Sequence, residues 1–256
     1  MRIVIKIGTS TLAHPSGLLN IKRVEELCKI MSDLKNAGNE IILVSSGAIA
    51  MGVGKLSLHE KPHDIPTRQA AAAVGQCELM YTYDKLFSEY NHTVAQILIT
   101  GDDVEHENRR HNFENTILRL LQLGVLPIIN ENDTISTDEI VIGDNDTLGA
   151  IVAKAVNANL FILLSDIDGL FTADPHKDEN AQLISGVEEI TPEIEKMTGG
   201  AGSKLGTGGM TTKIKAAVTA NAAGIDMVIA NGKNPKLLYD ILDGKSVGTK
   251  FLAKKA

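Results

Sequence analysis

Cysteine is scarce in this sequence. The 256 residues include two, Cys28 and Cys77, and both lie in apolar stretches with a regular period. A disulfide framework or a structural zinc site needs more cysteines or histidines at close spacing than this pair supplies. We therefore predict that both residues are buried free thiols in a protein of a reducing compartment.

Long hydrophobic runs and basic patches are missing as well. The apolar run at residues 2–7 is too short and too charged for a signal peptide and is expected to form a strand. The least charged internal stretch, residues 41–54, contains three glycines and falls short of a membrane span. The net charge is −7 with scattered lysine and arginine, which argues against a nucleic-acid surface. We expect a cytoplasmic protein without membrane or nucleic-acid partners.

Three familiar motifs are absent or misleading. The P-loop pattern G-x-x-x-x-G-K-[ST] does not occur, because Tyr239 takes the place of the first glycine before Gly244-Lys245-Ser246. No G-x-G-x-x-G follows a predicted strand, which removes most support for a dehydrogenase. The segment His59-Glu60-Lys61-Pro62-His63 matches H-E-x-x-H, but proline disfavours the helix that this zinc motif requires.

Apolar runs of strand character alternate with helical periods along the chain. Strands are predicted at residues 2–7, 40–44, 93–99, 125–130, 160–164 and 226–230. Helices are predicted at residues 21–34, 67–90, 109–123, 145–157, 210–223 and 235–242, and a hairpin at 135–141. The strands are rich in Val, Ile and Leu on both faces, as in sheets covered by helices on both sides. The order predicts an α/β fold, a three-layer αβα sandwich with a mostly parallel central sheet.

Small and polar residues follow most of the predicted strands. Ligands of open α/β sheets bind beyond the carboxyl ends of the strands, so these residues are expected at one edge. A glycine-rich run late in the chain leads into a helix. The segments are Lys6-Ile7-Gly8-Thr9-Ser10, Val44-Ser45-Ser46-Gly47-Ala48-Ile49-Ala50, Asn130-Glu131-Asn132-Asp133, Gly143-Asp144-Asn145-Asp146, Ser165-Asp166 and Gly206-Thr207-Gly208-Gly209-Met210-Thr211-Thr212-Lys213.

Each segment alone has an ordinary alternative. Lys6 lies in an apolar strand, and burial without a partner would cost several kcal/mol, so we expect it beside an anion; the alternative is a surface lysine. Glycines before a helix present free amides to phosphate, and Lys213 adds a positive charge, although a plain flexible loop would look the same. Residues 143–146 suit either a helix cap or a carboxylate cluster for a metal or lysine.

Taken together and in this order, the segments resemble the amino acid kinase family, and the matching segment Gly169-Leu170-Phe171-Thr172-Ala173-Asp174-Pro175 adds to the likeness. Ser165 stands where the family pattern leads us to expect threonine. The chain also ends soon after Thr249, where many members continue into a small PUA domain. The resemblance implies one amino acid kinase domain over residues 1–256 without a PUA domain. Its lobe at about 1–150 would hold the acceptor, and its lobe at about 151–256 the nucleotide.

For the chemistry, the resemblance implies ATP-dependent phosphoryl transfer with Mg²⁺. Lys6, Asp146 and Lys213 are the implied catalytic residues: the lysines stabilise the transferred group, and Asp146 fixes them or Mg²⁺. Mg²⁺ would be held mainly by the ATP phosphates, with Asp146 as a candidate ligand. The implied ATP-binding residues are Lys6, Gly8, Ser165, Asp166, Thr207, Gly208, Gly209, Met210, Thr211, Thr212 and Lys213.

For the acceptor, the resemblance implies L-glutamate, converted to L-glutamyl 5-phosphate by direct in-line transfer in the first step of proline biosynthesis. Asp133 would pair with the free α-ammonium, whereas Asn145 and Ser46 would bond carboxylate. A kinase for N-acetylglutamate must accept a neutral amide, beside which a buried unpaired carboxylate would be costly. The implied substrate-binding residues are Ser46, Gly47, Asn130, Asp133, Asp144 and Asn145.

Two other functions stay open at this point. One is a kinase of the same fold for N-acetylglutamate, carbamate or a nucleoside monophosphate. The other is a non-catalytic amino-acid sensor, since feedback inhibition by proline is a family trait. The family also implies a homodimer or homotetramer, for which the alanine-rich helix at residues 67–90 is a candidate interface.

Overall fold

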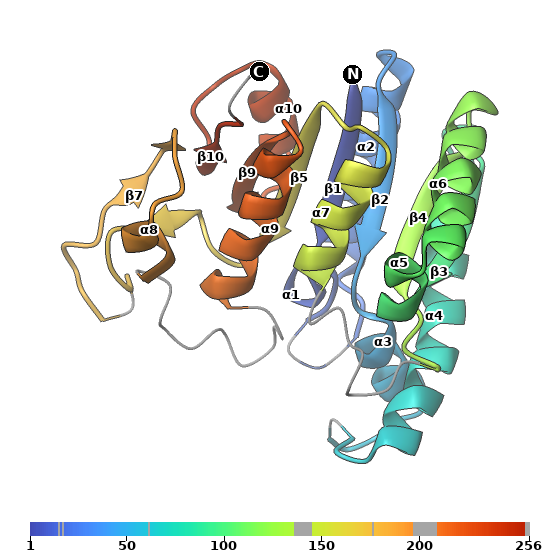
Figure 1. Cartoon of the computed structure of the whole chain (residues 1–256). Helices are drawn as coiled ribbons and strands as arrows, with labels where there is room; N and C mark the ends of the chain where they lie inside the picture. The colour runs from blue at the N-terminus through green and yellow to red at the C-terminus, as the bar shows by residue number, and fades with distance from the viewer. Residues whose placement is uncertain are drawn as a thin grey trace.

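The computed structural model describes residues 1–14, 16, 18–60, 62–135, 145–175, 177–196 and 209–253, without the side chains of 195 and 196. A sheet of eight strands runs through the middle in the order β3-β4-β2-β1-β5-β9-β10-β8 (Figure 1). Its paired strands are parallel except for β9 and β10, which are antiparallel. The strands are β1 Arg2–Ile7, β2 Glu40–Ser45, β3 Val94–Ile99, β4 Leu126–Glu131, β5 Leu160–Ser165, β8 Gly186–Val187, β9 Asp226–Asn231 and β10 Thr249–Phe251. A separate antiparallel pair joins β6 (Leu170–Phe171) to β7 (Leu183–Ile184).

Helices cover both faces of the sheet. The larger ones on one face are α6, α7 and α9, and those on the other are α2, α4 and α10 (Figure 1). The helices are α1 Thr9–Leu12, α2 Ile21–Asn36, α3 Ala48–Lys55, α4 Ile65–Ser88, α5 Gly101–Glu105, α6 Glu107–Gln122, α7 Asn145–Ala155, α8 Pro192–Lys196, α9 Met210–Ala222 and α10 Leu237–Leu242. The predicted three-layer αβα sandwich with a mostly parallel sheet is confirmed.

Alternation along β1 shows why this sheet needs helices on both sides. Ile3, Ile5 and Ile7 are buried in the core under α2 and α4, whereas Val4 is buried in the core under α6, α7 and α9. Successive strand side chains point to opposite faces, so Lys6 shares the side of Val4 and points toward α7 and α9. Each of the two cores contains strand residues from both halves of the chain, such as Val4 and Met227.

Several short elements escaped the sequence analysis. α1, α5, α8 and the strands β6, β7, β8 and β10 have two to five residues each, too few for a hydrophobic period to stand out. α3 follows Gly47 directly and has eight residues, and it was not among the predicted helices. The predicted hairpin at 135–141 falls almost wholly on residues 136–144, which lie outside the described residues.

The two cysteines differ from each other. Cys28 is buried and Cys77 is exposed, and both are free, so the prediction of two buried thiols is wrong for Cys77. Cys77 follows the run Ala70–Ala73 in α4, and alanines do little to mark which side of a helix faces the core. No helix in the described ranges has both the length and the apolar content to cross a membrane.

Candidate active site

A buried carboxylate held between two lysines forms the centre of the site. Asp146 Oδ1 lies 2.5 Å from Lys6 Nζ, and Asp146 Oδ2 lies 3.0 Å from Lys213 Nζ. The exposed fractions are 7% for Lys6, 1% for Asp146 and 4% for Lys213, which excludes a surface lysine at position 6. The three residues come from β1, α7 and α9, far apart in the chain, and the structure brings together all three predicted catalytic residues.

Electrostatics keep Asp146 ionised. Burial by itself raises the pKa of this carboxyl, but the positive charges of Lys6 and Lys213 and their hydrogen bonds outweigh it and hold the pKa below its usual range. The Thr212 hydroxyl lies 3.2 Å from Asp146 Oδ2. An ionised Asp146 therefore fixes both ammonium groups at one point, the arrangement needed to stabilise charge on a transferred phosphoryl group.

Gly149 allows α7 to reach the sheet at this point. A Cβ at Gly149 would lie 2.6 Å from the Phe161 ring atom Cζ and 3.3 Å from Lys6 Cβ. Such distances are too short for any residue with a side chain to fit without movement. The missing side chain lets the first turn of α7 pack on β1 and β5, which brings Asp146 to Lys6.

The donor set fits Mg²⁺ that arrives on nucleotide phosphates. Mg²⁺ is commonly bound through one or two carboxylates plus substrate phosphates instead of by an all-protein cage. Within the described residues, no three His, Cys, Asp or Glu side chains are grouped to hold a metal. Asp146 is the predicted ligand, and its oxygens already lie beside two lysines.

Predicted nucleotide-binding residues line the same edge of the sheet. Ser165 ends β5, where its hydroxyl donates to Asp166 Oδ1 at 3.1 Å and its carbonyl accepts from the Gly232 amide at 2.7 Å. Gly209 precedes α9, whose first residues are Met210, Thr211, Thr212 and Lys213. The first amides of a helix have no partner within the helix and can bind phosphate. Thr207 and Gly208 lie outside the described residues.

Gly8 leaves room beside the Lys6 ammonium because it has no side chain. Its amide donates to the Leu164 carbonyl at 3.3 Å, so this amide is already bonded within the sheet. A Cβ at Gly8 would lie 3.6 Å from Lys6 Nζ. The absence of a side chain there leaves the lysine open to an incoming group.

On the acceptor side, Asn145 binds the ends of β2 and β4. Its Nδ2 lies 2.8 Å from Ser46 Oγ, 3.0 Å from Asn130 Oδ1 and 3.2 Å from the Ser45 carbonyl oxygen. The backbone decides which end of each amide is which, since the Glu131 N–H donates to Asn130 Oδ1 at 2.9 Å and the Ser45 carbonyl can only accept. Asn145 therefore points its Oδ1 elsewhere, and this buried atom has no hydrogen-bond partner among the described residues.

The orientation of the Asn145 amide decides which groups it can bind. Its unpaired oxygen is a hydrogen-bond acceptor and suits an N–H donor, whereas the sequence-based prediction was that Asn145 binds a carboxylate. Ser46 is better placed for the carboxylate, because its Oγ accepts from Asn145 and keeps its own hydrogen for donation. Gly47, in the left-handed conformation with φ 100, caps α3 beside it. Asp144 lies outside the described residues.

Acidic groups complete the acceptor side. Burial raises the pKa of Asp133 to about 6, the Glu131 carboxylate adds to the shift and Arg68 opposes it. Glu131 itself is 7% exposed. Two carboxylates that raise each other's cost of ionisation favour a bound cation.

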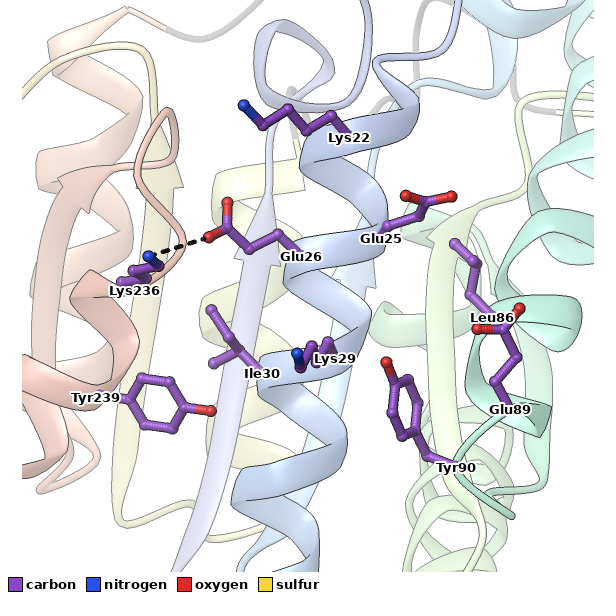
Figure 2. A pocket seen from close by; sticks show the side chains of 10 residues that line it. All are labelled: Lys22, Glu25, Glu26, Lys29, Ile30, Leu86, Glu89, Tyr90, Lys236 and Tyr239. Atoms are coloured by element: carbon purple, nitrogen blue, oxygen red, sulfur yellow. Dashed lines mark ion pairs between the residues drawn. The ribbon is translucent and has the colours of Figure 1, made fainter.

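A separate cavity lies away from the strand ends. It has a volume of about 690 Å³ and runs beside α2 on the face of α4 and α10 (Figure 2). Lys236 lies 4.0 Å from Glu26 there, and the Tyr239 hydroxyl donates to Asp33 at 2.8 Å. Its lysines and glutamates balance each other, so it does not present the cationic surface that a phosphate group needs, and none of the predicted site residues lines it. The lining residues are Lys22, Glu25, Glu26, Lys29, Ile30, Leu86, Glu89, Tyr90, Lys236 and Tyr239.

Comparison with known proteins shows the family of this chain. The sequence profile of the amino acid kinase family matches residues 1–231. A protein named glutamate 5-kinase from Clostridium perfringens is 54% identical over 99% of this chain and 96% of its own length, and one from Clostridium tetani is 55% identical over 99% and 95%. Giardia lamblia carbamate kinase bound to AMP-PNP superposes with a TM-score of 0.72 at 16% identity, covering 99% of this chain and 98% of its own. UMP kinase from Bacillus anthracis gives 0.66 at 15%, covering 99% and 96%, and both structures support the fold.

Proposed function

Because the chain belongs to the amino acid kinase family, we propose that Lys6, Asp146 and Lys213 are its phosphoryl-transfer centre. The chain phosphorylates the side-chain carboxylate of L-glutamate with ATP and Mg²⁺, the activity named for relatives at 54% and 55% identity. The product is L-glutamyl 5-phosphate, the first intermediate of proline biosynthesis. The observation that carries the assignment of roles is the meeting of two lysines from separate elements at one buried carboxylate.

The reaction needs charge stabilisation more than proton transfer. A glutamate carboxylate oxygen attacks the γ-phosphorus of ATP, the new O–P bond forms, and the bond to the bridging oxygen breaks to release ADP. The attacking carboxylate is ionised at neutral pH, so no general base is required. Lys6 and Lys213 stabilise the charge on the transferred group, and Asp146 holds them in register. Bound Mg²⁺ neutralises phosphate charge.

ATP binds along the ends of β1 and β5 and the start of α9. Gly8 leaves room beside Lys6 Nζ, and Ser165 and Asp166 lie at the end of β5. We assign the phosphates to Gly209, Met210, Thr211, Thr212 and Lys213 at the start of α9. The backbone amides there and the Lys213 ammonium are the donors that recognise them. Thr207 and Gly208 lie outside the described residues and keep the nucleotide-binding role predicted from the sequence.

L-Glutamate binds at the ends of β2 and β4. Its α-ammonium pairs with Asp133 and with the unpaired Oδ1 of Asn145, the two groups whose chemistry calls for a cation or an N–H donor. Carboxylate oxygens accept from the Ser46 hydroxyl and from the first amides of α3 after Gly47. Asn130 orients Asn145, and Asp144 adjoins it in sequence.

A coupled assay tests the function directly. With ATP and Mg²⁺, ADP release should depend on L-glutamate, and hydroxylamine should trap the acyl phosphate as a hydroxamate. N-acetylglutamate, carbamate and UMP, tested in parallel, should give less than about 1% of that rate. Turnover with one of these and none with glutamate would overturn the proposal, and calorimetric binding of glutamate or proline without turnover would favour a sensor.

Three further assignments accompany this function. We place the activity in the cytoplasm, where ATP is supplied and free thiols such as Cys28 and Cys77 persist. We propose a homodimer or homotetramer built on the outer face of α4, which exposes Cys77 and 65% of Tyr81. Proline, as a feedback inhibitor, would compete for the groups that bind the α-ammonium and α-carboxylate of glutamate.

A further inference from the structure

Gln76 extends the amide contacts of the acceptor site by one member. It lies on α4, is 7% exposed, and accepts a hydrogen bond at 2.9 Å from Asn130 Nδ2 through its Oε1. Asn130 in turn accepts from Asn145 Nδ2 at 3.0 Å. Gln76 Nε2 is buried without a hydrogen-bond partner among the described residues, so the bond to Asn130 is the polar contact described for the Gln76 side chain.

The three amides form a chain with a fixed direction. The Glu131 N–H and the Asn145 Nδ2 both donate to Asn130 Oδ1, which turns Asn130 Nδ2 toward α4. Asn130 is 1% exposed, so this Nδ2 needs an acceptor within the protein. Gln76 Oε1 supplies it, and this bond supports the orientation of Asn130 in which Asn145 donates through Nδ2 and leaves its Oδ1 unpaired.

Close packing of α3 and α4 holds Gln76 in place. A Cβ at the neighbouring Gly75 would lie 1.7 Å from the Ala48 carbonyl oxygen, and one at Gly52 would lie 1.8 Å from the Ala71 carbonyl oxygen. The two helix backbones therefore touch. Because α3 begins at Ala48, this contact ties Gln76 to the helix start that follows Ser46 and Gly47.

We propose that Gln76 is a positioning residue for the substrate L-glutamate. It helps to orient the Asn130 and Asn145 amides so that Asn145 presents a hydrogen-bond acceptor to the α-ammonium. This inference rests on the proposed function. Without Gln76, Asn130 Nδ2 is left buried without an acceptor, which weakens the hold of Asn130 on Asn145 Nδ2 and loosens the Asn145 amide. The enzyme would lose its preference for a substrate that carries an amine, while the phosphoryl-transfer centre stays intact.

The test compares glutamate with glutarate, which has both carboxylates and no amine. We expect Gln76→Leu to raise the KM for glutamate about tenfold, with kcat and the KM for ATP changed less than about twofold to threefold. The ratio of kcat/KM for glutamate to that for glutarate should fall at least about tenfold. Gln76→Glu, which keeps an acceptor for Asn130 Nδ2, should retain most of this ratio.

Tyr83→Phe is the matched control, because Tyr83 lies on α4 and bonds Ser45 Oγ at 2.8 Å without touching the amide chain. It should leave the glutamate-to-glutarate ratio within about twofold of wild type.

A folded Gln76→Leu with an unchanged ratio would overturn the inference. If Gln76→Leu does not fold, Gln76→Met, of similar length and shape, is measured in its place. If neither folds, Gln76→Glu decides: it should keep the ratio within about threefold of wild type, and a folded Gln76→Glu that loses the ratio would overturn the inference. Glutamate turnover by the wild type, measured in the same series, separates failure of this inference from failure of the proposed function.

Discussion

At the proposed phosphoryl-transfer centre, Lys6, Asp146 and Lys213 interact as full charges, whereas at the proposed glutamate-binding end Gln76, Asn130 and Asn145 interact as neutral amides. All of these residues are buried except Asn145, which is half-buried, and α7 joins the two groups, since Asn145 and Asp146 are adjacent residues in its first turn. The contrast matches the two tasks. Charged groups stabilise a transition state, whereas amides whose donor and acceptor ends are fixed in orientation discriminate between substrates by the groups that these carry. If the two ends act separately, a substitution at one end should leave the kinetic constants that report on the other end unchanged.

The largest effect is expected from Lys213→Ala. Removing one of two ammonium groups from the transferred phosphoryl group should lower kcat about 10³-fold, roughly 4 kcal/mol of transition-state stabilisation. The KM for glutamate should change less than about threefold, because Lys213 lies on the nucleotide side. Steady-state kinetics with the hydroxamate assay measure both. Lys215→Ala, an exposed lysine on the same helix, is the control and should keep nearly full turnover. An unchanged kcat for Lys213→Ala would remove the role we assign to it.

Next come two glycines, one at each end. At Gly75 a new Cβ would meet the backbone carbonyl of Ala48 at 1.7 Å, and backbone cannot rotate away, so Gly75→Ala should destabilise the fold by about 3 kcal/mol. At Gly149 the new Cβ would meet the Phe161 ring, which can shift, so Gly149→Ala should cost about 1–2 kcal/mol. Urea unfolding measures both.

The kinetic consequences of the two glycine variants should separate. Gly75→Ala should raise the KM for glutamate, and Gly149→Ala should lower kcat by moving Asp146 from Lys6. Gly186→Ala is the control, because a Cβ there would meet its nearest described atom at 4.0 Å and the change should stay within about 0.5 kcal/mol. Equal effects of Gly75→Ala and Gly149→Ala on both constants would mean that the two ends do not act separately.

The acceptor end should also respond to pH. Burial raises the pKa of Asp133 to about 6, and only the ionised carboxylate pairs with the α-ammonium. As pH falls through 6, the protonated fraction rises, so kcat/KM for glutamate should fall and approach a tenfold loss per pH unit below pH 5. Above pH 7 this group should have no further effect. Asp133→Asn should lower kcat/KM at neutral pH and abolish this acid limb. An acid limb that survives in Asp133→Asn would assign it to another group.

The ionic end was easier to predict from sequence than the amide end. Lys6 stands out as a charge inside an apolar strand, and Lys213 and Asp146 belong to segments that resemble a family. Gln76 has no such signal, because it lies in an alanine-rich helix and its partner Asn130 is 54 residues away. The direction of the Asn145 amide depends on the backbone N–H of Glu131 and the carbonyl of Ser45, which only the folded chain brings together. The mostly parallel sheet with helices on both faces followed from strand patterns, whereas two-residue strands such as β8 had no period to reveal them.

The smallest expected effect concerns Ser165, the one position where the nucleotide side departs from the family pattern. Its hydroxyl donates to Asp166 Oδ1 at 3.1 Å, and threonine would keep this bond while adding a methyl group to a residue that is 6% exposed. Ser165→Thr should therefore change the KM for ATP less than about threefold, whereas Ser165→Ala should raise it about fivefold, roughly 1 kcal/mol for one hydrogen bond. Neither change should alter the KM for glutamate. If Ser165→Ala raised that constant as much as the KM for ATP, the hydroxyl would influence both ends of the site, and the division between ionic centre and amide chain would have to be redrawn.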